Sequence, residues 1–477
     1  MQPQVNQVLE TPTESLAHLL ERMQTEFHRA PMPPVAQRKN RLKLLKKLLI
    51  DRQDLLLEAV SADFGHRCLH ETLFAEIAQL IEEINYVSKH LSHWAKPQKQ
   101  RLPLHLKPGQ ARIHYQPKGV VGILSPWNYP LLLSLGPLIS AWSAGNRAII
   151  KPSELTPNTN QCLSDLIERI DGAHAAVVTG DATVAEQLCR LPLDHLFFTG
   201  SSTIGRKVMA AAASNLTPVT LELGGKSPVL IDQHVDLDQA CASIIFAKCL
   251  NAGQTCIAPD YVLCHQRMYE PFQRALLRIA SKLYPTFRDN PDYSAIIDQR
   301  HFKRLQAMLL DAEQHGATLT SLEPQAKNAS ISRKIPLTLL TNCTDAMQAM
   351  QAEIFGPLLP IISIPSVQAG LDHIAARPKP LALYCFTTRQ TVQRKVINTT
   401  HSGSLCINDA ITQVAVPSLP FGGVGESGMG AYHGQAGFQE LSHSKAVLVR
   451  QSVTPMILFT PPWGRSVHRL AKKWLLR

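Results

Sequence analysis

Val120-Val121-Gly122-Ile123-Leu124 is the first of five short apolar runs that together decide the fold. The other four runs are Ala148–Ile150, Ala175–Val178, His195–Phe198 and Val219–Leu223. A segment long enough for a helix separates each run from the next. Short apolar strands that alternate with helices are typical of a parallel, doubly wound sheet. The stretch from 120 to 223 therefore predicts a Rossmann-like α/β domain, which binds its ligand beyond the carboxyl ends of the strands.

A second α/β series follows this domain, from a strand at Pro228–Ile231 to another at Leu405–Ile407. The chain has 477 residues, which is too long for a single hydrophobic core. Amphipathic helices are expected over 13–29, over 35–60 and over Glu71–Trp94. We expect the following units: 1–96 with 119–225 as the first domain, 226–410 as the second, 97–118 with 411–450 as a small bridging sheet, and 451–477 as a basic amphipathic tail.

Composition and cysteine usage indicate a globular protein of a reducing compartment. Apolar residues make up 45% of the chain and charged residues 18%. The ten cysteines form no CxxC pair, no zinc-ligand spacing and no disulfide-type framework, so we expect no metal site. The first ten residues do not resemble a signal peptide, and no apolar run reaches the ~18–20 residues that span a bilayer. We therefore expect a cytoplasmic protein.

The net charge of +11 is concentrated in three segments, 38–47, 96–107 and 465–477. Excess positive charge is compatible with nucleic acid, a membrane surface or an anionic cofactor. The sequence contains no helix-turn-helix, zinc-finger or RNA-recognition signature, so nucleic acid is not an expected partner.

The strongest candidate for chemistry is the stretch from Asn251 to Tyr261, NAGQTCIAPDY, which contains Cys256. Gly253 allows a sharp turn before the cysteine, and Pro259 keeps the following residues out of a helix. The pattern would present one thiol at a loop. Taken alone, however, the stretch is better explained by a buried structural cysteine, a common location for free thiols.

Six further motifs accompany this stretch in a fixed order. The full series is PWNYP at 126–130, KPSE at 151–154, FTGS at 198–201, LELGGKSP at 221–228, GQTC at 253–256, EIFGP at 353–357 and PFGGVGESGMG at 420–430. The series resembles the NAD(P)-dependent aldehyde dehydrogenase superfamily over roughly residues 35 to 450. The sequences of 253–261 and 429–434 are similar to those of the class 3 branch and, within it, to those of bacterial coniferyl aldehyde dehydrogenases.

The resemblance implies a role for three residues in catalysis. Cys256 would attack the aldehyde to form a thiohemiacetal, whose oxyanion the Asn128 amide and the Cys256 N–H would bind. Glu222 would act as general base for the water that hydrolyses the resulting thioester. Without the family, the favoured interpretations are structural: Asn128 as a turn former and Glu222 as a capped or solvated carboxylate at a strand end. The shared order of the motifs reverses both. Lys226, close to Glu222 in the sequence, stays unassigned.

The resemblance also implies that the first domain binds NAD, with NADP as an alternative, and that the second carries the nucleophile. Lys151 and Glu154 would lie beside the adenosine ribose, where a carboxylate disfavours a 2′-phosphate. Glu353 would orient the nicotinamide ribose, with Phe355 beside the ring. The turn 200–205 matches neither G-x-G-x-x-G nor a Walker loop. It resembles the family's strand-to-helix turn under the pyrophosphate, with Gly200, Ser201 and Gly205 as its residues.

Other functions and substrates are compatible with the same pattern. A catalytically silent binding protein is disfavoured because Cys256, Glu222, Asn128 and Glu353 are all present, and an acylating or esterase activity because Glu222 favours water as acceptor. The resemblance suggests aromatic enals as substrates, with medium and long aliphatic aldehydes as alternatives. It further implies a homodimer, in which the bridging segments add strands to the edge of the partner subunit.

The tail beyond Pro461 and Pro462 is expected to form one amphipathic helix from Trp463 to Arg477. Its apolar residues fall on one stripe, and its basic residues lie mainly off that stripe: Val467, Leu470, Ala471, Trp474 and Leu475 against Arg469, Lys472, Lys473 and Arg477. Such a helix suits an anionic membrane interface. The alternative is that the stripe packs on the partner subunit near the substrate entrance.

Overall fold

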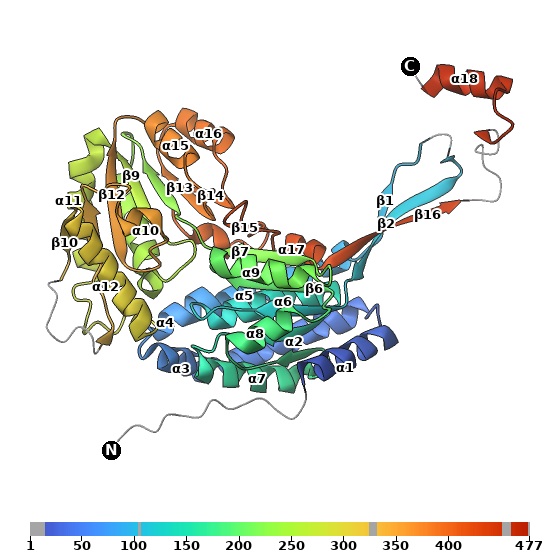
Figure 1. Ribbon diagram of the computed structural model, residues 1–477, viewed down its shortest axis with the longest axis horizontal. Helices are drawn as coiled ribbons and strands as arrows, with labels where there is room; N and C mark the ends of the chain where they lie inside the picture. The colour runs from blue at the N-terminus through green and yellow to red at the C-terminus, as the bar shows by residue number, and fades with distance from the viewer. Residues whose placement is uncertain (1–14, 104–105, 324–331, 451–458, 476–477) are drawn as a thin grey trace.

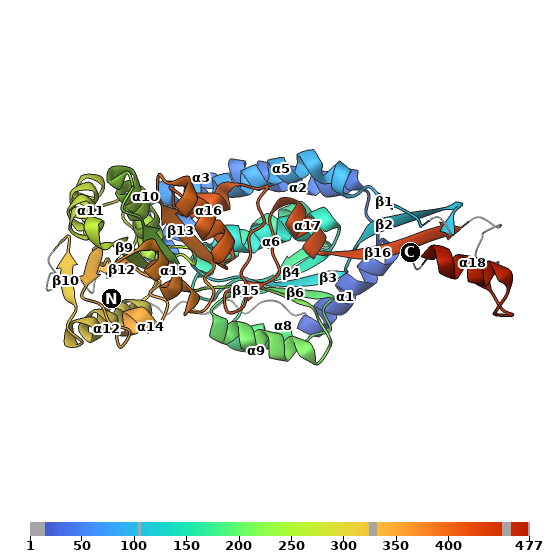
Figure 2. The ribbon, with the colours of Figure 1, turned by 90° about the horizontal axis from the view of Figure 1, so that it is seen from above.

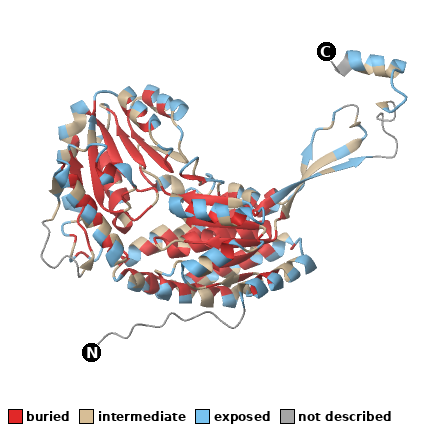
Figure 3. Ribbon diagram, in the orientation of Figure 1, coloured by how far each residue is buried: buried red, intermediate tan, exposed pale blue. Residues whose placement is uncertain are grey.

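The architecture is that of a computed structural model, which describes residues 15–103, 106–323, 332–450 and 459–475. Two α/β bodies lie side by side, and a narrow antiparallel arm projects from one of them (Figure 1). Buried residues concentrate in the sheets and in the helix faces that cover them, whereas the arm is exposed or half-buried (Figure 3). No helix within the described residues is long and apolar enough to cross a membrane.

The first body contains a six-stranded sheet in the order β15-β7-β6-β3-β4-β5. Its strands are β3 (Val120–Leu124), β4 (Arg147–Lys151), β5 (Ala175–Val177), β6 (His195–Gly200), β7 (Val219–Leu223) and β15 (Gly428–Met429). The five strands expected from the sequence are all present and pair in parallel. The short β15 pairs antiparallel with β7 and places Gly428 opposite Glu222.

Helices cover both faces of this sheet (Figure 2). Near the chain start lie α1 (Leu16–Arg29), α2 (Val35–Asp51), α3 (Gln53–Phe64), α4 (Leu69–Thr72), a π-helical turn (Leu73–Ile77) and α5 (Ala78–Trp94). The connections between strands form α6 (Pro130–Ala144), α7 (Pro157–Asp171), α8 (Ala182–Cys189) and α9 (Ser202–Ala213). Helices α1, α8 and α9 lie on one face, and α6 with α2 and α5 on the other.

Two helix expectations differ from the structure. The expected helix over 35–60 is two helices, because Arg52 leaves the helical conformation between them. Its guanidinium forms an ion pair with Asp165 on α7. The expected helix over 71–94 begins earlier, at Leu69, and contains the π-helical turn before Ala78. That turn brings the Glu76 carboxylate to the start of α6, where it accepts hydrogen bonds from the N–H groups of Leu131 and Leu132.

The second body contains a seven-stranded sheet in the order β10-β11-β12-β9-β8-β13-β14. Its strands are β8 (Pro228–Ile231), β9 (Tyr261–His265), β10 (Thr318–Ser321), β11 (Thr338–Thr341), β12 (Leu358–Ile364), β13 (Ala382–Phe386) and β14 (Ser404–Ile407). Its helices are α10 (Leu237–Cys249), α11 (Tyr269–Leu283), α12 (Gln299–Gln314), α14 (Gln348–Gln351), α15 (Val367–Ala375) and α16 (Gln390–Thr399). All neighbouring strands are parallel except β10 and β11, so the second series in the sequence also forms an α/β sheet.

The arm is a three-stranded antiparallel sheet of β1 (Gln98–Gln100), β2 (Gly109–Pro117) and β16 (Ser442–Arg450). Of the segment 411–450, Ser442–Arg450 therefore joins the arm. Gly428–Met429 joins the first sheet, and α17 (Gly434–Glu440) packs on α6. The tail ends in α18 (Ser466–Leu475), which lies beyond the arm and away from both bodies (Figure 1).

Candidate active site

Cys256 follows a tight turn between α10 and β9. A 3-10 turn at Leu250–Gly253 ends α10, with Asn251, Ala252 and Gly253 all at positive φ. A Cβ on Gly253 would lie 2.5 Å from the carbonyl oxygen of Gly356, so only glycine allows these two loops to touch. The turn expected from Gly253 is thus present, and it fixes the Cys256 loop against the loop that carries Glu353.

Buried Gln254 holds this turn in place through three hydrogen bonds. Its amide nitrogen donates to the carbonyls of Asn251 and Ala295, both at 3.0 Å, and its amide oxygen accepts from the N–H of Ile297. A buried polar side chain with all these partners stabilises one loop conformation. Sequence reasoning did not assign Gln254 this structural role.

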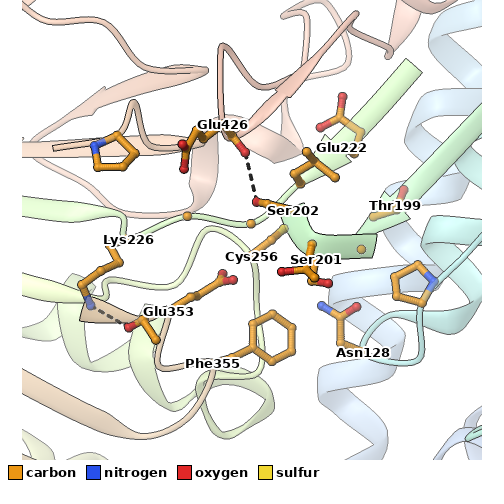
Figure 4. A pocket seen from close by; sticks show the side chains of 18 of the residues that line it. Asn128, Thr199, Ser201, Ser202, Glu222, Lys226, Cys256, Glu353, Phe355 and Glu426 are labelled. Carbon is orange, nitrogen blue, oxygen red and sulfur yellow. Dashed lines mark hydrogen bonds between the residues drawn. The ribbon is translucent and has the colours of Figure 1, made fainter. Parts of the chain in front are cut away.

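Two cavities meet at Cys256. The first, of about 850 Å³, lies between the two bodies and contains Asn128, Glu222, Glu353 and Phe355 in its wall (Figure 4). The second, of about 550 Å³, is lined mainly by apolar and aromatic side chains. Cys256 and Leu133 belong to the walls of both cavities. The thiol is therefore accessible from two sides to two different molecules.

Asn128 lies two residues before α6 and reaches the Cys256 loop. Its side-chain amide nitrogen donates to the carbonyl of Gln254 at 3.1 Å, which uses one of its two N–H groups. The other N–H is left for a ligand in the cavity. The sequence prediction that Asn128 and Cys256 share one site is consistent with this geometry.

A buried ion pair supports Asn128 from behind. The guanidinium of Arg67 donates to the Asn128 carbonyl at 2.9 Å and pairs with Glu76 at 3.0 Å, and both charged side chains are fully buried. Asn251 donates to the same carbonyl. Removing one partner of such a pair leaves an uncompensated buried charge, so the pair holds the backbone before α6 firmly. No motif in the sequence pointed to Arg67 or Glu76.

Glu222 is buried in β7 at the edge of the larger cavity. Within the described residues neither of its carboxylate oxygens has a hydrogen-bond partner. Burial raises its pKa well above the usual value, and the nearby Glu440 carboxylate raises it further. A bound water or ligand can supply the hydrogen bonds that this buried carboxyl group lacks.

The Cys256 thiol has its pKa raised to about 12, first by burial and then by the carboxylates of Glu353 and Glu222. The backbone N–H groups of Cys256 and Ile257 face the sulfur and act in the opposite direction. Without a ligand, therefore, the thiol is protonated at neutral pH. All ten cysteines are free, and no three His, Cys, Asp or Glu side chains in the described ranges gather to hold a metal ion.

The loop that carries Glu353 and Phe355 is fixed by charged side chains. Lys226 forms an ion pair with Asp260 and also donates to the carbonyls of Ala349 and Ala352. Asp260 accepts from the N–H of Ile354 at 2.8 Å. Lys226, which the sequence left unassigned, thus holds the loop on one side of the cavity.

Arg304 holds the same loop from the other side. Its guanidinium donates to the carbonyls of Ile354 at 2.7 Å and Phe355 at 3.3 Å. Phe355 adopts a positive φ of 48°, and its ring meets Trp127 edge to face at 5.5 Å. Burial and Asp260 raise the Glu353 pKa to about 8. The carboxyl group therefore titrates close to neutral pH.

The far end of the larger cavity is suited to a dinucleotide. Gly200, Ser201, Ser202 and Thr203 line it where α9 begins, and Ser201 is the N-cap of that helix. The first N–H groups of a helix have no partners inside it and attract phosphate. The buried Thr199 hydroxyl in the same wall has no partner within the described residues. These features fit the pyrophosphate and ribose groups of NAD(P).

Three expected cofactor residues lie outside the wall of this cavity. Gly205 is buried in α9, where a Cβ would lie 2.6 Å from Leu223, so it allows α9 to pack closely on β7. Lys151 is buried at the end of β4, with its ammonium group 3.3 Å from the half-exposed Glu154 carboxylate. This pair lies at the carboxyl edge of the sheet, near the cavity's wall on β6 but separate from it.

The second cavity approaches Cys256 from the opposite side. Its wall includes the aromatic rings of Phe74, Tyr129, Phe246, Tyr284, Phe421 and Tyr432. The rings of Phe74 and Phe246 are largely exposed at 65% and 48%. Tyr129 donates to or accepts from the Thr255 hydroxyl at 2.6 Å, beside the nucleophile. The arrangement suits an apolar or aromatic molecule that presents one reactive group to the thiol.

Known proteins share both the sequence and the fold. The profile of the Aldehyde dehydrogenase family matches residues 2–447. The chain is 45% identical to a probable coniferyl aldehyde dehydrogenase of Pseudomonas aeruginosa, over 97% of this chain and 96% of that protein.

Solved structures of two related enzymes superpose closely. The substrate-bound state of AldH from Staphylococcus aureus matches with a TM-score of 0.90 at 36% identity, covering 96% of this chain and 98% of that one. An aldehyde dehydrogenase of Mycobacterium tuberculosis in complex with NAD+ matches with a TM-score of 0.84 at 26% identity, covering 92% and 90%.

Proposed function

The chain belongs to the aldehyde dehydrogenase family, whose enzymes oxidise aldehydes with NAD(P)+, and we propose that it does so through a thioester on Cys256. The observation that carries this proposal is the position of Cys256 in the walls of both cavities. An aldehyde in the apolar cavity and a nicotinamide in the larger one would then meet at the same sulfur. We propose that the first body binds the cofactor and that the second body carries the nucleophile.

Nucleophilic attack is the first step. An aldehyde cannot release hydride directly, so a nucleophile first converts its carbonyl to a tetrahedral adduct. The Cys256 sulfur bonds to the carbonyl carbon, and the thiol proton is lost to a neighbouring base or to water. The negative oxygen is held by the free N–H of the Asn128 amide and by the Cys256 backbone N–H. Losing one such donor typically reduces the rate by ~10²–10³.

NAD(P)+, which the start of α9 and the loop of Glu353 and Phe355 would hold, would supply the acceptor for a hydride. Loss of that hydride from the adduct carbon turns the adduct on Cys256 into a thioester. Glu222 then takes a proton from the water that attacks this thioester, and Cys256 leaves as thiol. A carboxyl group whose pKa is raised by burial is a stronger base once it is ionised. Glu222 has the burial, and its lack of protein partners leaves both oxygens available to water.

Aromatic enals of the coniferyl aldehyde type are the substrates that we propose. The many aromatic rings of the second cavity support this choice, because flat conjugated molecules pack well against them. Its volume of about 550 Å³ also admits medium aliphatic aldehydes. The relative from Pseudomonas aeruginosa is named for coniferyl aldehyde, which points the same way.

A substrate panel tests the function. NADH formation is measured with coniferyl aldehyde, benzaldehyde and decanal, each with and without coenzyme A. We expect the highest kcat/KM for coniferyl aldehyde, a carboxylic acid as product and no dependence on coenzyme A. A rate that requires coenzyme A would replace the hydrolytic mechanism, and a clear preference for decanal would replace the substrate class. Cys256→Ala is the matched control and should abolish turnover with every aldehyde.

Glu154 leads us to propose that NAD+ is preferred to NADP+. Its carboxylate lies beside Lys151 at the carboxyl end of β4, where a 2′-phosphate would meet negative charge. Glu154→Gln should raise kcat/KM for NADP+ more than for NAD+, because it removes the repulsion and keeps the shape. A wild-type enzyme with higher kcat/KM for NADP+ would overturn this preference.

A further inference from the structure

The arm brings together two basic segments that are far apart in the sequence. The segment 96–118 contains β1 and β2, and the segment 441–477 contains β16 and α18. We call these two segments of the sequence the basic arm. Strand β16 pairs with β2 along nine residues, so the segments share one sheet. In Figures 1 and 2 this sheet and α18 extend away from both bodies.

The positive charge of the protein resides in this arm. The two segments contain thirteen Lys and Arg residues and no Asp or Glu. The rest of the chain has 35 basic and 37 acidic residues, so its net charge is −2. The net charge of +11 therefore belongs to the arm and not to the catalytic bodies.

Four of these cationic side chains surround a cavity at the β1–β2 end of the arm. The cavity has a volume of about 530 Å³, and its wall includes Lys99, Arg101, Lys107 and Arg112. Its other wall residues are uncharged, including Gln100 and Gln110. Arg112 donates to the Gln110 amide oxygen at 2.5 Å. A concave site with four cations suits a phosphate group.

Apolar side chains are exposed in the tail of the same arm. Trp463 and Leu470 are 71% and 69% exposed. On α18, Leu470 lies within a helix whose Arg469, Lys472 and Lys473 are also exposed. The side chains of Trp474 and Leu475, which continue the expected stripe, lie outside the described residues. Basic and apolar groups side by side are the composition of an interfacial helix.

We propose that the basic arm docks on an anionic phospholipid surface, with the four-cation cavity on lipid phosphate and α18 in the headgroup region. Nucleic acid would explain the charge but would give no role to the exposed Trp463 and Leu470 side chains. A second copy of this chain is a weaker partner for the four-cation cavity, because the chain outside the arm has a net charge of only −2 and complements thirteen cations poorly. The cavity lies at β1 and β2, so the outer edge of β16 stays available to a partner subunit.

Vesicle binding tests the proposal with the full chain. The protein is sedimented with sucrose-loaded vesicles of phosphatidylcholine, with or without phosphatidylglycerol. We expect binding only when phosphatidylglycerol is present. Raising NaCl from about 0.1 M to about 1 M shortens the Debye length from ~10 Å to ~3 Å and should release most of the protein.

Variants of the protein distinguish binding through the basic arm from a general response to net charge. Lys99→Gln, Arg101→Gln and Lys107→Gln together remove three charges from the cavity and should weaken binding on the order of 100-fold. The matched control, Lys43→Gln, Arg274→Gln and Lys282→Gln, removes three exposed charges from the bodies and should change binding less than about threefold. Trp463→Ser with Leu470→Ser keeps the charge and should weaken binding about 10-fold or more.

Several outcomes would overturn the proposal. Full-length protein that stays in the supernatant with phosphatidylglycerol vesicles refutes it directly. Equal losses in the cavity variant and in the control would show a response to net charge alone. Tighter binding to a DNA duplex than to vesicles would assign the arm to nucleic acid. A cavity variant that changes the sedimentation coefficient without affecting vesicle binding would assign it to a second copy.

Discussion

Cys256 lies among carboxyl groups rather than beside a cation. Reactive cysteines in many enzymes have a lowered pKa because a positive group is adjacent. Here burial, Glu353 and Glu222 raise the thiol pKa to about 12, and only backbone N–H groups oppose this effect. At neutral pH the thiol is therefore in its protonated, less nucleophilic form.

The thiol pKa gives a prediction for alkylation. Below its pKa, the thiolate fraction of a thiol rises about tenfold per pH unit. The reaction of Cys256 with iodoacetamide should therefore accelerate about tenfold for each pH unit from about pH 7 to about pH 9. Peptide mass spectrometry after timed exposure locates the modification on Cys256. Cys256→Ser shows the reaction of the other nine cysteines. A rate that levels off below about pH 8 would contradict the raised pKa.

At the scale of elements, the 3-10 turn after α10 connects the nucleophile to the cofactor loop. Gly253 at φ +73° contacts Gly356, so the position of Cys256 depends on the loop that carries Glu353. Lys226, Asp260 and Arg304 in turn fix that loop. The catalytic geometry thus depends on backbone contact between two loops about 100 residues apart in the sequence.

Gly253→Ala tests this dependence. A Cβ would meet the Gly356 carbonyl at 2.5 Å and would also disfavour the left-handed backbone, so the loops must separate. Because small displacements of a reacting group are costly, we expect kcat to fall on the order of 10- to 100-fold. Gly172→Ala is the control, since its Cβ would meet nothing within 4 Å and its φ is −59°. Normal kcat in the Gly253 variant would show that the loops move independently.

Much of the fold could be predicted because strand periodicity is a local property. The runs at Val120–Leu124, Val219–Leu223 and Pro228–Ile231 have the same bounds in the structure as in the sequence expectation. The break at Arg52 has no helix-breaking residue to mark it in the sequence, and its ion pair with Asp165, more than 100 residues later, is visible only in the structure. The antiparallel β15 likewise depends on a distant partner, β7.

The candidate site was likewise predictable in its motif residues and not in the residues that support them. Asn128, Glu222, Cys256, Glu353 and Phe355 belong to motifs, and the structure brings all five to one cavity. Arg67, Glu76 and Arg304 carry no motif, and they act by holding the backbone of motif residues. Supporting residues of this kind become visible only when the distances are known.

At the scale of the whole molecule, the arm has two strand edges that no other described strand covers. Its outer strands β1 and β16 each have one neighbour, β2, and the arm projects from the body (Figure 1). Free strand edges commonly pair with another chain. We therefore propose a homodimer in which β16 extends a sheet of the partner subunit.

Sedimentation velocity at micromolar concentration tests the dimer. The wild-type chain should sediment as a two-chain species. Leu448→Asp with Val449→Asp places two charges on exposed residues of β16 and should shift the protein towards monomer. Leu310→Asp, at a residue of α12 that is 59% exposed, should leave the species unchanged. A wild-type monomer at this concentration would refute the dimer.

The most direct test of the central claim is the mass of the enzyme during turnover. Glu222→Gln lacks the base for hydrolysis, so mixing it with coniferyl aldehyde and NAD+ should form NADH in a single burst and leave one acyl group on the protein. Intact mass spectrometry should show the mass of one coniferyl acyl group per chain, and digestion should place it on the peptide that contains Cys256. Steady turnover of Glu222→Gln with no acylated Cys256 would contradict the thioester mechanism.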